Sequence, residues 1–267
     1  MTTFGNADGT TAEIWDVSEH PQGADMDAAW LEALRHAPAW LTNGERLLLF
    51  TLIYCLRPRR YLEVGVLHGG SALIVVKALD AVNGEGKLVL VDPEPQIDDS
   101  HWRQIEHRSV LIRGESPTVL GQAEQMAGGS FDFVFIDANH ETIPVMRDAN
   151  GVLPYLADGA YILFHDGFRT AVSRAIDRFV IAHSGSIVDF GMLTREFTRK
   201  TDGPQSVQEK AGMARSCGFR LVQFRRRHGR SILLNAMLGL WFRCEDFLKW
   251  PYRKLRGSAA KGGDPAR

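Results

Sequence analysis

The sequence predicts an α/β fold built on a doubly wound, mostly parallel sheet. From residue 60 onward, short apolar stretches alternate with helix-forming stretches. Near-continuous apolar segments such as Phe131–Ile136 and Ala160–Phe164 are typical of parallel strands that are buried on both faces. Alternation of such strands with helices generates a doubly wound sheet. The expected strands are 60–65, 87–92, 108–113, 131–137 and 159–165, and the expected helices are 71–82, 100–107, 116–127, 141–155 and 168–183.

Two segments at the end of this pattern have strand character. Ser186–Phe190 and Met192–Phe197 are separated by Gly191, and we expect them to form a closing β-hairpin. A further β-prone segment, Phe219–Phe224, follows a polar stretch.

The segment before residue 58 is expected to contain an arm and two helices. Residues 1–24 are polar and contain glycine, which predicts a loose arm. Asp25–Arg35 fits a short helix, and Thr42–Asn43 is a capping signal for a second helix over Glu45–Leu56. The sequence leaves open whether these helices cover a site or mediate dimer contacts.

Length and composition are those of a globular protein. The 267 residues are 45% hydrophobic, which is enough for one large domain with additions. The three cysteines, Cys55, Cys217 and Cys244, are widely spaced, so they predict neither a disulfide framework nor a zinc motif. We expect a cytoplasmic protein without a secretory signal, because no basic and then apolar N-terminal pattern is present and the longest apolar run, Ile232–Phe242, is too short to span a bilayer.

Charge is distributed unevenly along the chain. Residues 198–267 hold 16 Lys and Arg against 5 Asp and Glu, whereas the net charge of the whole chain is −1. An acidic body with a basic extension suggests two different roles. We therefore expect three segments: an arm with helices over 1–57, an α/β domain over 58–200 and a basic C-terminal extension over 201–267.

The C-terminal extension combines two basic clusters with an apolar segment. Arg225–Arg230 precedes the apolar run Ser231–Trp250, and further Lys and Arg follow up to Arg256. This pattern favours peripheral contact of residues 225–256 with an anionic membrane at its inner face. A helix packed on its own domain or in a homo-oligomer is the alternative. No nucleic acid partner is expected, because no aromatic recognition pattern accompanies the arginines.

A glycine-rich turn joins the first strand of the sheet to its helix. Glu63 lies near the end of that strand, and Gly65, Gly69 and Gly70 form the turn. We expect Ser71 to cap the helix and to donate a hydrogen bond. The second strand ends at Asp92, where a carboxylate can bind both hydroxyls of a ribose. The layout predicts a nucleotide-type ligand at the carboxyl edge of the sheet.

The turn lacks the features of a pyrophosphate site. Val66, Leu67 and His68 follow Gly65, so the middle glycine of a dinucleotide-binding loop is missing. The Glu63 carboxylate would also repel phosphate. A cationic nucleoside without phosphate fits these residues better.

A second group of polar residues follows the fourth and fifth strands. It consists of Asp137, Asn139, His140, Glu141, His165 and Asp166. Parallel strands bring these ends to the same edge of the sheet. Asp137, His165 and Asp166 could hold Mg²⁺ or another divalent cation that lowers the pKa of a substrate hydroxyl. Alternatively, His140 or His165 acts as a general base without metal. A purely structural role for these side chains is the third option.

These motifs together resemble class I S-adenosylmethionine-dependent methyltransferases. The residues that carry the resemblance are Glu63–Ser71, Val91–Asp92, Phe131–Glu141 and Phe164–Asp166, and it extends over about 58–197. More narrowly, the sequence is similar to the bacterial branch whose fourth strand ends Ile-Asp-x-x-His and whose fifth ends His-Asp. That branch includes O-methyltransferases of small molecules and sugars. The resemblance implies a Rossmann-like seven-stranded sheet whose antiparallel last strand lies in the closing hairpin.

The resemblance also assigns roles to individual residues. It implies that Glu63, Gly65, Gly69 and Ser71 meet the methionine part of S-adenosylmethionine, that Asp92 meets the ribose, and that Glu115 or Ser116 lies near the adenine. Asp137 contacts the cofactor, and Asp137, His140 and His165 are the expected catalytic residues. The implied function is methylation of a hydroxyl on a small molecule, sugar or glycolipid-like acceptor. The alternative is a non-catalytic cofactor-binding or scaffold protein that acts through its basic extension.

Overall fold

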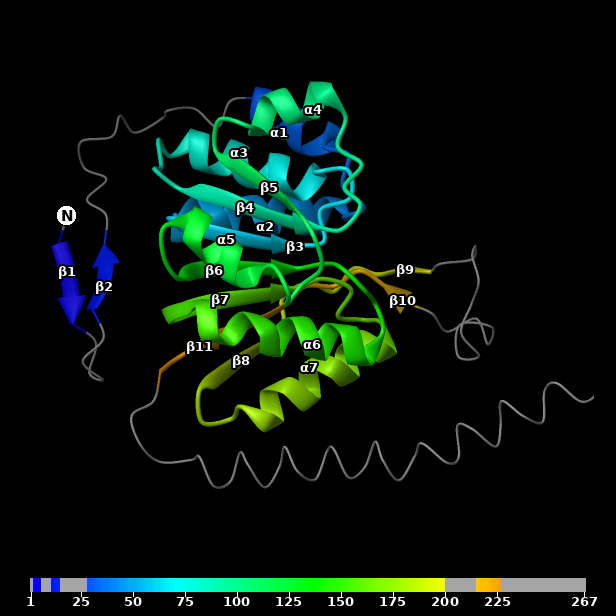
Figure 1. Cartoon of the computed structure of the whole chain (residues 1–267). Helices are drawn as coiled ribbons and strands as arrows, with labels where there is room; N and C mark the ends of the chain where they lie inside the picture. Colours follow the sequence, from blue (N-terminus) through cyan, green and yellow to red (C-terminus); the bar gives the residue numbers. More distant parts are fainter. Residues whose placement is uncertain (1, 6–10, 15–27, 200–214, 227–267) are drawn as a thin grey trace, which may run out of the picture. The chain divides into compact units, whose positions relative to one another are not determined.

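The computed structural model describes residues 2–5, 11–14, 28–199 and 215–226 (Figure 1). The chain divides into two units, residues 1–36 and 37–267. The predicted basic, apolar segment over 225–256 lies outside the described residues from residue 227 onward.

The first unit contains a short hairpin and a helix. Strand β1 (Thr2–Gly5) pairs antiparallel with β2 (Thr11–Ile14), with Thr2 opposite Ile14 and Gly5 opposite Thr11. The expectation of a loose arm over 1–24 is therefore wrong for these residues, which satisfy backbone hydrogen bonds in a ladder. Helix α1 (Ala28–His36) corresponds to the first predicted helix.

The second unit is built on a seven-stranded sheet, which confirms the predicted fold class. Its strand order is β5-β4-β3-β6-β7-β11-β8. The strands from β5 to β7 are parallel neighbours, whereas β11 runs antiparallel to both β7 and β8. The strands are β3 (Arg60–Val64), β4 (Lys87–Asp92), β5 (Ser109–Arg113), β6 (Phe131–Ile136), β7 (Leu156–Phe164), β8 (Ile187–Met192) and β11 (Arg220–Phe224).

The predicted closing hairpin is wrong. β8 continues through Gly191 to Met192 and pairs with β11, not with the residues that follow it. The register shifts at this point, because Leu221 faces Gly191 whereas Val222 faces Asp189. Gly191, with φ of 77°, therefore marks a β-bulge instead of a turn. Two short strands precede β11: β9 (Thr198–Arg199) pairs with β10 (Arg215–Ser216).

Helices cover both faces of the sheet (Figure 1). Alternate residues of β3 divide the core: Leu62 and Val64 pack with α5, α6 and α7, whereas Glu63 faces α3, whose Ser71 it contacts. In sequence order the helices are α2 (Asn43–Leu56), α3 (Gly70–Ala81), α4 (Asp99–Ile105), α5 (Leu120–Ala127), α6 (Thr142–Val152), η1 (Leu153–Tyr155) and α7 (Thr170–Ala182). In the described part of the chain, no helix combines the length and apolarity needed to cross a bilayer.

The start of α2 is fixed by a capping box, as Thr42 predicts. The Thr42 hydroxyl accepts the Glu45 N–H at 3.2 Å, and Glu45 Oε2 accepts the Thr42 N–H at 2.8 Å. Glu45 is nevertheless fully buried. Its other oxygen accepts the Gly218 N–H at 2.5 Å, so one side chain ties the start of α2 to the segment before β11.

The sheet predicts where the chain can be shortened. A chain that ends at Ser206 lacks β11, which leaves the facing edges of β7 and β8 unpaired and removes the buried Phe219 and Val222. We expect it to lose cooperative thermal unfolding in circular dichroism. A chain that ends at Arg226 keeps β11 and should melt cooperatively. Cooperative unfolding of the shorter chain would contradict the role assigned to β11 and would support a domain that ends near residue 200.

Candidate cofactor and catalytic site

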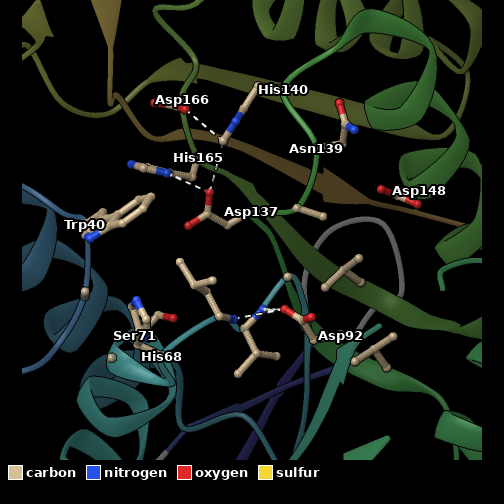
Figure 2. Close-up of a pocket in the computed structure, with 18 of the residues that line it drawn as sticks. Trp40, His68, Ser71, Asp92, Asp137, Asn139, His140, Asp148, His165 and Asp166 are labelled. Carbon is tan, nitrogen blue, oxygen red and sulfur yellow. Dashed lines mark hydrogen bonds and ion pairs between the residues drawn. The ribbon is translucent and has the colours of Figure 1, made fainter. Parts of the chain in front are cut away.

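A cavity of about 570 Å³ opens at the carboxyl ends of the central strands. This size is within the usual range of small-molecule sites, and the position next to the β3–β6 switch in strand order is where open α/β sheets bind ligands. Figure 2 shows 18 of the residues that line it and labels ten of them. The walls come from residues 38–41, 64–68, 91–93, 114–116, 137–140 and 165–166 together with Asp148 and Cys217.

Gly65 allows the glycine-rich turn to approach the end of β6 closely. Its φ is 89°, and a Cβ at this position would overlap the backbone of Asp137 and Ala138. The Gly65 N–H donates to the Val91 carbonyl at 2.9 Å, which continues the ladder between β3 and β4 into the turn. The turn is therefore held against both neighbouring strand ends.

Asp92 fixes the same turn through its carboxylate. Oδ2 accepts the N–H groups of Val66 and Leu67 at 2.8 and 2.9 Å, and Oδ1 accepts the Glu94 N–H at 2.8 Å. Because a carboxylate offers about four acceptor sites, one site remains for a ligand hydroxyl. The ribose contact of Asp92 stays a prediction, and the structure adds a role in shaping the loop.

Glu63 is a buried acid with two hydroxyl donors. Ser71 Oγ donates to Oε1 at 2.5 Å, and the Tyr61 hydroxyl donates to Oε2 at 3.2 Å. Burial raises the pKa of Glu63 to about 8, with the negative charges of Asp137 and Asp92 adding to the effect and the hydroxyl donors opposing it. Glu63 is therefore mostly protonated at neutral pH until a cation comes near.

Ser71 donates the expected hydrogen bond but is not the helix cap. The N-cap of α3 is Gly69, which adopts φ of 75° and makes no side-chain capping bond. Ser71 lies in the first turn, so its hydroxyl reaches the Glu63 carboxyl across the start of the helix. The adjacent Gly70 has no room for a Cβ beside the backbone of Pro38 and Ala39, which also line the cavity.

The end of β5 supplies a further polar patch. Glu115 and Ser116 line the cavity together with Asp148 of α6, and their position near the adenine stays a prediction. Ser116 Oγ and Asp148 Oδ1 are buried without a hydrogen-bond partner among the described residues. Burial raises the pKa of Asp148 to about 6. Asp148 could not be recognised from the sequence, because it lies inside a helix and belongs to no strand-end motif.

The structure brings together the predicted polar residues of β6 and β7. Asp137 Oδ1 lies 2.8 Å from His165 Nδ1, and Asp166 Oδ2 lies 2.9 Å from His140 Nε2 (Figure 2). The two pairs are linked, because His140 Nε2 is 3.8 Å from Asp137 Oδ1. Asn139 does not join them: its side-chain oxygen accepts the Glu141 N–H at 2.8 Å.

Neither histidine has the near-neutral pKa expected of a general base. Burial alone lowers the pKa of His140, but the carboxylates of Asp137 and Asp166 outweigh it and raise the pKa to about 9. The pKa of His165 is also raised well above its usual value, because Asp137 outweighs the effect of burial. In turn, the histidines keep the pKa values of Asp137 and Asp166 below the ordinary range despite burial.

The geometry bears on the metal site predicted at this edge of the sheet. Asp166 has φ of 55°, and its carboxylate accepts the Cys217 N–H in addition to contacting His140. Within the described residues, the ligand atoms of Asp137, His165 and Asp166 do not all lie close enough to one another to share an ion. Those of Glu45, His165 and Cys217 do. The predicted Mg²⁺ role of the first three stays a prediction.

The segment 37–41 was not recognised from the sequence and forms part of the mouth of the cavity. Arg46 of α2 fixes it, since its guanidinium donates to the carbonyls of Ala37 at 2.8 Å, Leu41 at 3.0 Å and Ala39. Trp40 is 69% exposed and lies edge-on to His68, with ring centroids 6.2 Å apart. A large exposed aromatic ring at a cavity mouth is a candidate surface for a substrate.

Comparisons with known proteins agree with this geometry. Residues 62–167 match the model of a family described as a methyltransferase domain. The predicted resemblance to class I S-adenosylmethionine-dependent methyltransferases is confirmed. The matched segment contains the glycine-rich turn, Asp92, Asp137 and the His165–Asp166 pair. None of the curated protein sequences matches the chain.

Solved structures share the fold at low sequence identity. An O-methyltransferase from Bacillus cereus in complex with S-adenosylhomocysteine has a TM-score of 0.54 and 20% identity, covering 78% of this chain and 95% of that one. The O-methyltransferase TomG from Streptomyces achromogenes, in complex with S-adenosylmethionine, has a TM-score of 0.51 and 20% identity, covering 74% of this chain and 89% of that one. Cofactor-bound Rv0187 from MTB has a TM-score of 0.52 and 19% identity, covering 75% of this chain and 89% of that one.

The charge on His140 can be measured directly. We expect the His140 imidazole to titrate near pH 9 in nuclear magnetic resonance spectra of the protein labelled at histidine. In Asp166→Asn the pKa should fall, because one neighbouring carboxylate is lost while burial still favours the neutral ring. Asp99→Asn, which alters an exposed carboxylate on α4, is the matched control and should leave the titration unchanged. A wild-type pKa near 6.5 would contradict the assigned pairing.

Proposed function

We propose that the protein is an S-adenosylmethionine-dependent O-methyltransferase that acts on a hydroxyl of a small molecule, sugar or glycolipid-like acceptor. One observation carries the proposal. A single cavity extends from Ser71, whose hydroxyl binds the buried, cation-seeking acid Glu63 of β3, to a carboxylate–histidine cluster at the ends of β6 and β7. The complexes of two O-methyltransferases of the same fold, one with S-adenosylmethionine and one with S-adenosylhomocysteine, support the choice of cofactor.

Glu63 and its neighbours suit the amino-acid end of the cofactor. A ligand ammonium group beside Glu63 would stabilise the ionised carboxylate, which burial alone disfavours. Ser71 holds that carboxylate in place, and Gly65 and Gly69 keep the turn free of side chains. These residues explain why a phosphate-bearing nucleotide is not the expected ligand.

The polar patch at the end of β5 suits the adenine. Asp148 Oδ1 and the Ser116 hydroxyl make no hydrogen bond to a described residue, although Arg147 Nε lies 3.9 Å from Asp148 Oδ1, and both residues lie at the cavity wall. A carboxylate can accept a hydrogen bond from the exocyclic amino group of adenine, and a hydroxyl can donate a hydrogen bond to a ring nitrogen. With Asp92 between this patch and the turn, the three contacts follow the order of adenine, ribose and methionine.

The cluster at the ends of β6 and β7 would serve the acceptor. The cofactor supplies an electrophilic methyl group, so the protein must position a hydroxyl oxygen and take its proton. His140 is the residue proposed for the proton, since it lies at the cavity wall and is held by Asp166. Its pKa of about 9 falls when a cationic ligand is near, which brings the ring toward the useful range. A general base of this kind contributes roughly 10²–10⁴-fold to the rate.

The remaining roles of the cluster are positional. Asp137 is ionised and can orient the acceptor hydroxyl or the cofactor while it holds His165. A divalent cation on Asp137, His165 and Asp166 would compete with the hydrogen bonds these groups already make to one another and to Cys217. The scaffold alternative depends on the basic extension, which lies outside the described residues from residue 227 onward, and no observation on the described residues favours this alternative.

Calorimetric titration with S-adenosylmethionine tests the proposal through Glu63. At about pH 7 we expect binding to release close to one proton, detected as a dependence of the heat on the buffer, because Glu63 ionises on binding. The affinity should rise as the pH increases toward the pKa of the ligand's own amino group, roughly 7.7–8.0. Glu63→Gln should bind roughly 10–100-fold more weakly and release no proton.

Glu94→Gln is the matched control, since it alters an exposed acid near the same loop. It should bind like the wild type. The absence of binding to the wild-type protein, or proton release that persists in Glu63→Gln, would refute the cofactor assignment.

A further inference from the structure

Three ligand-type side chains meet beside the cavity. Glu45 at the start of α2, His165 after β7 and Cys217 before β11 bring a carboxylate oxygen, an imidazole nitrogen and a sulfur within 4.8 Å of one another. All three residues are buried. His165 Nε2 lies 3.5 Å from Glu45 Oε1 but makes no hydrogen bond to any described residue. A buried imidazole nitrogen without such a partner requires an explanation.

The neighbours of His165 and Glu45 hold them in an orientation that suits a bound cation. Asp137 Oδ1 lies 2.8 Å from His165 Nδ1 and holds a proton there, so a bound cation would replace the proton that the ring otherwise carries on Nε2, the nitrogen that lies near Glu45. Glu45 is fixed by the N–H groups of Thr42 and Gly218, one on each oxygen. The Asp137 carboxylate thus orients His165 as the outer-shell carboxylate of a zinc site usually orients a metal-binding histidine.

The backbone at Cys217 is held in an unfavourable conformation. Its φ is 73°, in the left-handed region that residues with a Cβ rarely adopt. Two hydrogen bonds keep it there: the Cys217 N–H donates to the Asp166 carboxylate, and its carbonyl accepts the Phe168 N–H at 3.1 Å. The sulfur in turn lies 3.4 Å from the Thr198 hydroxyl. Strain that is maintained by several contacts is typical of a residue with a functional position.

We infer that Glu45, His165 and Cys217 form a binding site for a divalent cation of the zinc class. Thiolate and imidazole ligands favour zinc over magnesium, which prefers oxygen. Three protein ligands with one open position are the pattern of catalytic zinc. His165 and Cys217 line the cavity, so an ion bound by them would lie next to it. This site differs from the predicted set of Asp137, His165 and Asp166 in two of its three ligands.

The site gives the cation a role in the proposed reaction. An acceptor hydroxyl in the open position would lose its proton more easily, because a zinc ion lowers the pKa of a bound oxygen. This role rests on the proposed methyl transfer, whereas the binding of metal does not. The competing explanation for the same side chains is a protonated His165 that bridges Asp137 and Glu45 without any ion.

Metal binding by the full-length chain separates these explanations. The protein, freed of any affinity tag and stripped with a chelator, should take up one zinc ion per chain and, with Co²⁺, show a near-ultraviolet thiolate-to-cobalt absorption band. Cys217→Ser should lose the band and bind zinc at least about tenfold more weakly. Cys55→Ser is the matched control, since Cys55 is exposed, and should retain both properties. Asp137→Asn should keep the band and weaken zinc binding about 10–100-fold.

Two results would overturn the inference. One is folded wild-type protein that takes up no zinc, which requires no variant to interpret. The other is a cobalt band or zinc affinity that is unchanged in a Cys217→Ser protein with a wild-type circular dichroism spectrum. Titration of the metal-stripped protein with S-adenosylmethionine is a separate measurement, so a failure of the metal site and a failure of the proposed cofactor can be distinguished.

Discussion

The packing of several carboxyl groups at one edge of the sheet constrains the rest of the site. Glu63 and Asp92 lie in the last residues of β3 and β4, and Asp137 and Asp166 follow β6 and β7; all four are wholly or largely buried. Each is stabilised differently: Glu63 by protonation and hydroxyl donors, Asp92 by backbone N–H groups, and the other two by histidines. Because a buried charge without a partner is costly, the loops around the cavity are built to supply these donors. The negative potential that remains favours a cationic ligand.

The sequence predicted the parts of the fold that depend on local pattern. Apolar strands and alternating helices were placed within a few residues of their observed bounds, since burial on both faces leaves a continuous apolar run. The order of the last strands could not be predicted in this way. Gly191 looked like a turn but accommodates a bulge, and the strand that fills the gap between β7 and β8 is Arg220–Phe224, which follows residue 200.

The site residues that lie at the ends of strands could be predicted from the sequence. Asp137, His140, His165 and Asp166 converge because parallel strands share one carboxyl edge. Glu45, Asp148, Trp40 and Cys217 were missed as site residues, because they come from helices and connections whose position depends on tertiary packing. The charge states were also beyond the sequence: the pKa values of Glu63 and His140 are set by burial and by partners that are distant in the chain.

The most direct test of this account is a crystal structure of the protein with S-adenosylhomocysteine. The account predicts the amino group of the ligand beside Glu63, the ribose beside Asp92, and the adenine between Ser116 and Asp148. The sulfur should then face the Asp137–His165 pair and His140. A ligand bound outside this cavity, or in the reverse direction with its adenine beside Glu63, would contradict the central claim.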